Sequence, residues 1–160
     1  MKEEVIEYRH ESTILEAYVA YDETLERPIP GVLISHAWGG RGELECAKAR
    51  ALAGQGYLGF ALDLYGKGVL GSGPDENATL MQPFLDDRAL LQERLLVALS
   101  ALQGHALVDP SRIAAVGFCF GGLCVLDLAR TGTEIQGVAS FHGLLGPPGN
   151  TTGGHINAKV

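Results

Sequence analysis

The apolar positions of this chain group into short uncharged runs, separated by helical patterns and glycine-rich turns. Four of these runs predict strands buried on both faces, at residues 31–35, 57–62, 113–116 and 135–141. Strands of this kind belong to parallel sheets whose two faces are covered by helices. The pattern therefore indicates an alternation of strand and helix along most of the chain.

Apolar residues at helical spacing predict three helices between these strands. The first covers residues 43–55 and the third covers residues 121–130. The second is expected to begin at Pro83, because proline fits the first turn of a helix, and to end at Gly104. Residues 66–77, which precede it, are rich in glycine and are expected to form a loop.

Two β-rich segments at residues 4–9 and 13–21 predict an antiparallel pair at the start of the sheet. The whole order predicts an α/β fold with a doubly wound, mostly parallel sheet and helices on both faces. Residues 1–160 suit a single domain. Glycine-rich residues 143–154 lead into residues 156–160, which look like the start of a further strand. We therefore expect the domain to be incomplete at its C-terminus.

The segment richest in chemistry runs from residue 112 to residue 128, with the sequence RIAAVGFCFGGLCVLDL. A predicted buried strand leads into Gly117, Cys119 and Gly121, and a helix follows at once. This is the G-x-S-x-G nucleophile-elbow pattern with cysteine in place of serine. The glycines allow strand and helix to approach closely, and the helix N-terminus favours a thiolate. The pattern predicts that Cys119 is a nucleophile.

A simpler interpretation of Cys119 is a small buried hydrophobic residue, as free cysteines often are. Glycine makes up 22 of the 160 residues, so a GxCxG match by itself is weak evidence. Its position between a strand and a helix is what favours the nucleophile.

Three motifs together resemble the dienelactone hydrolase family. They are HAWGG at residues 36–40, DLYG at 63–66 and GFCFGG at 117–122, and the resemblance extends over residues 5–145. It implies an α/β-hydrolase with a Cys-His-Asp triad that cleaves small lactones and esters through an acyl-enzyme. It implies no cofactor, and no cysteine or histidine stands at a spacing typical of a metal site.

The resemblance also implies roles for single residues. Cys119 would be the nucleophile, and the backbone N–H groups of Phe120 and Ala37 would form the oxyanion hole. The triad aspartate and histidine would follow Val160. Dienelactone hydrolase itself has a glutamate at the position of His36, so its gating of the cysteine does not carry over to this chain.

Four further residues are candidates to line the substrate pocket. His36 and His142 each follow a buried strand, at the sheet edge where ligands bind in such folds. The alternative for His36 is a buried histidine bonded to backbone. Trp38 and Tyr65 are either pocket wall or ordinary packing. Asp63 is expected to bond loop backbone rather than to act as the triad acid.

Composition narrows the choice of partners and location. The net charge of −7 and pI near 5.1 argue against nucleic acid and anionic membranes as partners. The chain shows no secretory signal or membrane-spanning stretch, and its odd number of cysteines fits a reduced cytoplasmic protein. The expected partner is a small-molecule ester or lactone. A homo-oligomer would form through the exposed sheet edge at residues 135–141.

Three functions remain open on the sequence alone. The first is a hydrolase of small carboxylic esters or lactones, with residues 1–160 inactive by themselves. The second is a catalytically incomplete α/β module that binds a ligand or a partner. The third is a redox-active thiol protein, which rests on Cys119 alone and lacks a suitable resolving cysteine.

Overall fold

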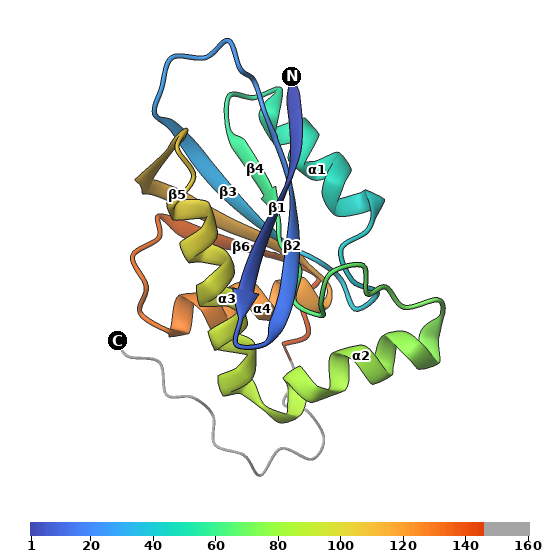
Figure 1. Cartoon of the computed structure of the whole chain (residues 1–160). Coiled ribbons are helices and arrows are strands. Elements are labelled where there is room, and N and C mark those ends of the chain that lie inside the picture. Colours follow the sequence, from blue (N-terminus) through green and yellow to red (C-terminus); the bar gives the residue numbers. More distant parts are fainter. Residues whose placement is uncertain (146–160) are drawn as a thin grey trace.

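The computed structural model describes residues 1–145, which form one six-stranded sheet and four helices (Figure 1). The strands are β1 (Lys2–His10), β2 (Thr13–Tyr21), β3 (Ile29–Ser35), β4 (Leu58–Ala61), β5 (Val108–Phe118) and β6 (Gly137–Phe141). The helices are α1 (Glu43–Ala53), α2 (Pro74–Asp86), α3 (Arg88–Gln103) and α4 (Phe120–Arg130).

The strands follow the order β1-β2-β4-β3-β5-β6, which confirms the mixed, mostly parallel sheet. β1 pairs with β2 as an antiparallel hairpin, and β2 joins β4, also antiparallel. β4, β3, β5 and β6 are parallel to one another. The carboxyl ends of these four strands therefore lie at one edge of the sheet, where folds of this class bind ligands.

Helices cover the sheet on both faces because successive side chains of a strand point to opposite sides. On one face, Leu33 and Phe60 pack with the apolar stripes of α3 and α4. On the other face, Val32 and Ile34 pack with the small residues of α1. Gly59 allows that approach, since a Cβ there would lie 2.5 Å from the Cα of Ala49.

The predicted start of the second helix is wrong. Two helices occupy this region: α2 begins at Pro74, and Pro83 lies inside it. The break comes at Asp87, whose carboxylate accepts a hydrogen bond from the N–H of Leu90 and caps α3. Proline is compatible with the first turn of a helix at either position, and the aspartate cap decides where the next helix begins.

β6 differs from the buried strand predicted at residues 135–141. It is shorter, and its residues alternate between exposed and half-buried. It pairs only with β5 among the described residues, so it is an edge strand. The expectations for residues 146–160 lie outside the part of the chain that the structure describes. Within residues 1–145 no helix is both long and apolar enough to cross a bilayer.

Candidate active site

Cys119 stands at a sharp turn between β5 and α4. β5 ends at Phe118 and α4 begins at Phe120, so Cys119 is the single residue between them. Its backbone has φ 55° and ψ −117°, a region that costs a non-glycine residue about 1–3 kcal/mol. Its N–H donates to the carbonyl oxygen of Phe141 at 3.0 Å, which ties the turn to the end of β6.

Two glycines make this turn possible. A Cβ on Gly117 would lie 1.9 Å from the carbonyl oxygen of Gly121, so strand and helix touch backbone to backbone. A Cβ on Gly121 would lie 2.2 Å from the carbonyl oxygen of Ser35. The elbow is therefore pressed against the end of β3, and side chains larger than hydrogen are excluded at both positions.

The first turn of α4 leaves the amides of Phe120 and Gly121 without a partner within residues 1–145, and that of Phe120 directly follows the cysteine. The N–H groups of Gly122 and Leu123 donate to the Cys119 carbonyl oxygen, at 3.0 and 3.4 Å. Within residues 1–145 the Phe120 N–H has no hydrogen-bond partner. An amide of this kind at a helix N-terminus is suited to stabilise negative charge.

The three cysteines differ in exposure. Cys119 is half-buried, whereas Cys46 and Cys124 are buried. Burial raises the pKa of the Cys46 thiol, and it raises the pKa of the Cys124 thiol strongly. Cys119 is therefore the thiol best placed to meet a reagent or substrate.

The loop after β3 is held by a buried glutamate on α1. Glu45 is 3% exposed, and its carboxylate accepts hydrogen bonds from the N–H of Ala37 at 3.3 Å and of Gly42 at 2.9 Å. The Ala37 N–H, expected from the sequence to face an oxyanion, is thus engaged by a carboxylate in this structure. Sequence reasoning missed Glu45. Its signal is the spacing Gly42-x-x-Glu45, the glutamate half of a capping box, in which the third helical residue accepts from the N-cap amide.

His36 lies fully buried beneath this loop rather than at an open surface. Its Nδ1 lies 2.6 Å from the Ala37 carbonyl oxygen, which can only accept, so Nδ1 carries the proton. Its Nε2 accepts from the Leu64 N–H at 3.2 Å. Both contacts require the neutral ring, and burial lowers the pKa of His36 below its ordinary 6.5. His36 is therefore the buried, backbone-bonded histidine that the sequence left open as an alternative to a pocket-lining residue.

Tyr65 and Trp38 come together above the elbow. The Tyr65 hydroxyl donates to the Trp38 carbonyl oxygen at 2.8 Å, and both side chains are half-buried. The Tyr65 ring stacks on Phe84 and Phe120, with centroids 5.7 and 6.4 Å apart, and meets the His36 ring edge-on at 4.7 Å. Burial raises the pKa of the Tyr65 hydroxyl well above its usual range, so it stays a donor.

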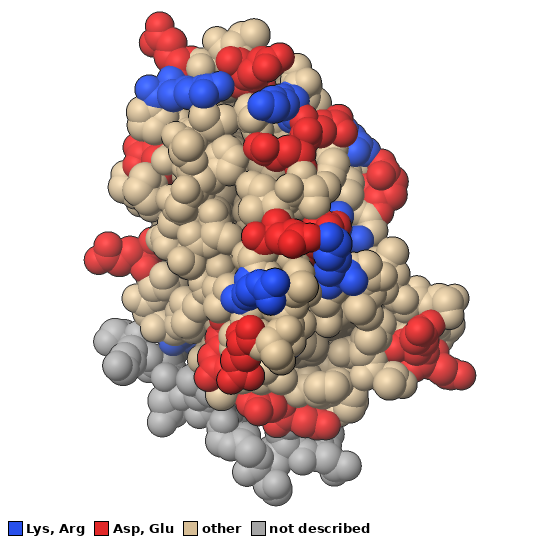
Figure 2. All heavy atoms as spheres, viewed as in Figure 1, with Lys and Arg blue, Asp and Glu red and all other residues tan. Residues whose placement is uncertain are grey.

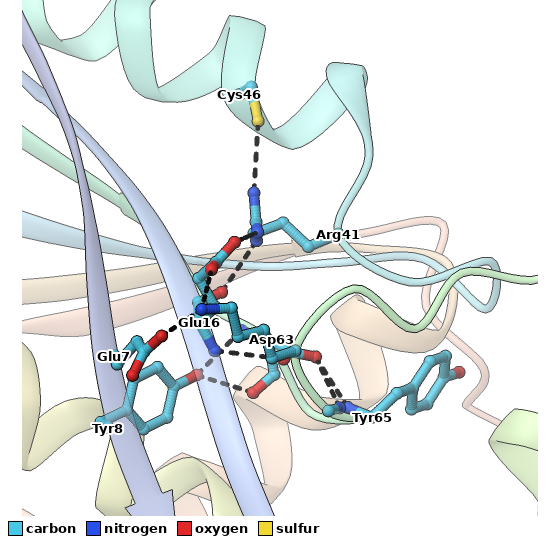
Figure 3. Close-up of polar contacts among 9 residues, drawn as sticks. Glu7, Tyr8, Glu16, Arg41, Cys46, Asp63 and Tyr65 are labelled. Atoms are coloured by element: carbon cyan, nitrogen blue, oxygen red, sulfur yellow. Dashed lines mark hydrogen bonds and ion pairs between the residues drawn. The ribbon is translucent and has the colours of Figure 1, made fainter.

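Asp63 is a structural residue, as expected. Its carboxylate accepts hydrogen bonds from the N–H groups of Glu16, Tyr65 and Gly66. The buried Tyr8 hydroxyl donates to the Asp63 carbonyl oxygen at 2.6 Å and accepts from its N–H at 2.9 Å. Figure 3 shows this carboxylate directed at the loop backbone next to Tyr65.

Arg41 links the loop after β3 to the β1–β2 hairpin, a contact that the sequence did not reveal. Its guanidinium donates to the backbone carbonyl and to the carboxylate of Glu16, and it reaches Cys46 on α1 at 3.8 Å (Figure 3). Lys67, which follows β4, pairs with the carboxylates of Glu7 and Glu16 on the same hairpin. Through Arg41 the loop after β3 is therefore fixed from the hairpin side, in addition to its anchoring by Glu45 of α1.

His142 follows β6 at the same sheet edge as Cys119. It is exposed, with φ 42°, and its ring lies 6.3 Å from the ring of Phe118. Phe118 in turn stacks on Phe141 at 4.9 Å. His142 is thus brought beside the elbow, in keeping with its position after a parallel strand.

A hollow of about 620 Å³ lies elsewhere, and its position argues against a catalytic role. It is lined by Gln103, Pro110, Ser111, Glu134, Ile135 and Gln136. Gln103 ends α3 and the other residues stand near the starts of β5 and β6, whereas Cys119 stands where β5 ends. Within residues 1–145, no three His, Cys, Asp or Glu side chains gather in a way that would hold a metal ion.

The sequence model of the dienelactone hydrolase family matches residues 15–159. This chain belongs to the dienelactone hydrolase family. A curated relative, the uncharacterised protein K02A2.1 of Caenorhabditis elegans, is 48% identical over 63 residues, which are 39% of this chain and 40% of that protein.

Solved structures similar to this dienelactone hydrolase family member include two above 30% identity. One is m3DLH, with TM-score 0.86 and 34% identity. The other is a dienelactone hydrolase-like promiscuous phosphotriesterase, P91, from metagenomic libraries, with TM-score 0.85 and 33% identity. A dienelactone hydrolase described as putative, from Klebsiella pneumoniae, shares the fold at 21% identity with TM-score 0.78, over 94% of this chain and 64% of that one. The first two matches each cover 89% of this chain and 59% of the other. The chain therefore spans about three-fifths of the length of these two structures.

Proposed function

We propose that this protein takes part in hydrolysis of small carboxylic esters or lactones, with Cys119 as the nucleophile of an acyl-enzyme. The observation that carries the proposal is the backbone of Cys119, held at φ 55° between β5 and the N-terminus of α4. A strained position persists only where the surrounding structure enforces it. Membership of the dienelactone hydrolase family supports the reaction class.

The reaction would begin with attack of the Cys119 thiolate on the substrate carbonyl carbon. The carbonyl π electrons move onto oxygen, and the Phe120 N–H donates a hydrogen bond to that oxyanion. Collapse of the tetrahedral intermediate expels the alkoxide and leaves a thioester on Cys119. Water then hydrolyses the thioester to the carboxylic acid and restores the thiol.

Hydrolysis of the thioester needs a base to activate water. From the family resemblance we expect the triad histidine and aspartate to follow Val160. His36 does not supply this function, since both of its ring nitrogens are bonded to backbone. Residues 1–160 alone are therefore expected to acylate once and to turn over slowly.

The surface agrees with a small neutral or modestly polar substrate rather than a polyanion. On the face shown in Figure 2, basic and acidic side chains are interspersed, with no extended basic field. The net charge is −7. Electrostatic binding of nucleic acid would require a concentrated basic surface.

The test is acylation by p-nitrophenyl acetate. Residues 1–160 should release about one equivalent of p-nitrophenolate per chain, with an acetyl group on Cys119 by mass spectrometry. Cys119→Ala should abolish the release, and Cys124→Ala serves as the control that retains it. Unchanged release from Cys119→Ala would place the nucleophile elsewhere. No acylation of the wild-type chain, or of a complete protein, would favour the alternative of a non-catalytic binding module.

A further inference from the structure

β1 forms a long edge of the sheet. Its nine residues, Lys2–His10, pair with β2 along one side, and within residues 1–145 no strand pairs with the other side. In Figure 1 it lies in front of the other strands. Proteins usually keep edge strands short, because a long row of free N–H and C=O groups invites another strand to pair. The length of this edge therefore points to a partner.

The register with β2 determines which backbone groups face this edge. Glu7 stands opposite Glu16, whose N–H and carbonyl oxygen are bonded to side chains of the loops after β4 and β3. Glu7 is therefore in a pair without mutual backbone hydrogen bonds, and its own N–H and C=O point outward. Since this pattern repeats at every second residue, the outward groups belong to Glu3, Val5, Glu7 and Arg9.

Two copies of β1 can meet in a register that satisfies all of these groups. In an antiparallel pair, residues with outward groups must face one another. A two-fold axis at Ile6 meets this condition and pairs all nine residues of the strand. It sets Glu3 opposite Arg9 of the second copy, and Val5 opposite Glu7 of the second copy. The symmetry forms each of these pairs twice, once on either side of the axis.

Charge favours this register over its two neighbours. An axis at Val5 sets Glu3 opposite Glu7, and an axis at Glu7 sets Glu7 opposite its own copy. Like charges directly opposite one another destabilise a strand pair, whereas opposite charges stabilise it. Within residues 1–145 neither Glu3 nor Arg9 forms an ion pair, so both are available to a second copy. The charge of Glu7 is already balanced by Lys67.

The centre of β1 is apolar, which suits burial in an interface. Val5 is 55% exposed although it is an aliphatic residue, and Ile6 is only half-buried. At the axis Ile6 meets its own copy, and the two Val5 side chains are diagonal neighbours on the other face. We propose that β1 is an interaction edge for a second copy of this chain, which joins the two sheets across a two-fold axis at Ile6. Its charged residues then oppose other strands and admit this one partner.

Charge reversal tests the interface in chains that also carry Ala139→Lys, a lysine that opposes pairing through β6. Sedimentation equilibrium of this parent chain should show a dimer in exchange with monomer. Glu3→Arg or Arg9→Glu turns both opposite-charge pairs into like-charge pairs, and each should raise the dissociation constant of the dimer roughly tenfold or more. An equimolar mixture of the two variants restores opposite charges in the mixed dimer. Its dissociation constant should return to within about threefold of the parent's.

Glu26→Arg and Arg112→Glu are the matched controls, because they change the net charge equally at exposed positions outside β1. Neither should change the dissociation constant. All four positions are exposed, so urea denaturation should show that every variant still folds. The proposal is overturned by a parent chain that stays monomeric, by controls that weaken the dimer as much as the β1 variants do, or by a mixture that fails to recover. None of these measurements depends on catalysis by Cys119.

A disulfide cross-link tests the position of the axis. In a chain with Cys119→Ala, Ile6→Cys sets two thiols opposite each other at the axis, where the Cα atoms of such a pair are about 4.5 Å apart and within reach of a disulfide. Lys2→Cys is the control, since residue 2 lies at the end of the strand and its copy is far beyond that reach. Mild oxidation should link the Ile6→Cys chains within the dimer and leave the Lys2→Cys chains unlinked. If Ile6→Cys links no faster than Lys2→Cys, the register is wrong.

Discussion

Gly121 lies directly against the end of β3, so that a Cβ on Gly121 would come within 2.2 Å of the Ser35 carbonyl oxygen. This contact joins the elbow that carries Cys119 to the loop that carries Ala37 and Trp38. Because both sides of the contact are backbone, neither can move aside as a flexible side chain would.

Gly121→Ala should therefore damage both folding and reactivity. Forcing a methyl group into this contact should lower the free energy of unfolding by roughly 1–3 kcal/mol or more, measured by urea denaturation. It should also slow acylation of Cys119. Gly137→Ala is the control, since a Cβ there meets nothing within 4 Å and should change stability little. Equal stability of the two variants would contradict the tight contact.

Cys119 should be the thiol that reacts first with a limiting amount of iodoacetamide. Cys46 and Cys124 are buried, and burial raises the pKa of both thiols, which reduces the reactive thiolate. Peptide mass spectrometry after brief labelling identifies the modified residue. Preferential labelling of Cys46 or Cys124 would remove the basis for Cys119 as nucleophile.

His36 should make the protein less stable as pH falls. Burial lowers the pKa of His36 in the folded protein below its ordinary 6.5. Below about pH 6.5 the unfolded chain binds a proton that the folded ring excludes, so the free energy of unfolding falls from about pH 7 toward pH 5. Above that range the contribution is fully present. The carboxylates of Asp63 and Glu45 oppose the lowering, and Arg41 adds to it.

His36→Asn isolates this contribution from those of the other histidines. The asparagine amide can still donate to the Ala37 carbonyl oxygen but does not titrate in this range. Urea denaturation at several pH values should show a flatter dependence for His36→Asn than for the wild type. Parallel curves would mean that His36 takes up a proton in the folded protein.

Residues 1–160 expressed alone should self-associate through β6. The outer edge of β6 is unpaired among the described residues, and Phe141 is 49% exposed beside it. The strand carries no charged residue, and charged residues are the usual protection of an edge strand. Sedimentation should show dimers or larger species at micromolar concentration.

Ala139→Lys provides the matched variant for this prediction. Residue 139 is exposed in the middle of β6, so a lysine there adds a charge without displacing core side chains. This variant should shift the population toward monomer. A wild-type chain that sediments as a monomer and unfolds cooperatively would show that β6 needs no further cover.

Local sequence determined the layout of the sheet and the position of the nucleophile. Uncharged apolar runs specify buried strands because only such strands tolerate helices on both faces, and these runs located β3, β4 and β5. Glycine at positions 117 and 121 around Cys119 specified the elbow, since no other residue allows that approach of strand and helix. The apolar runs and the two glycines are local signals, because each is read from the same few residues that form the strand or the turn.

Tertiary structure decided the hydrogen bonding of the loop after β3 and the exposure of its residues. The sequence placed His36 at a strand end, whereas the fold buries its ring and packs it against Tyr65 and Phe120. The sequence assigned Ala37 as a donor by resemblance, but Glu45 engages that amide from a helix eight positions further along the chain. A backbone N–H points in one direction and donates one hydrogen. The fold, not the local sequence, decides which acceptor it meets.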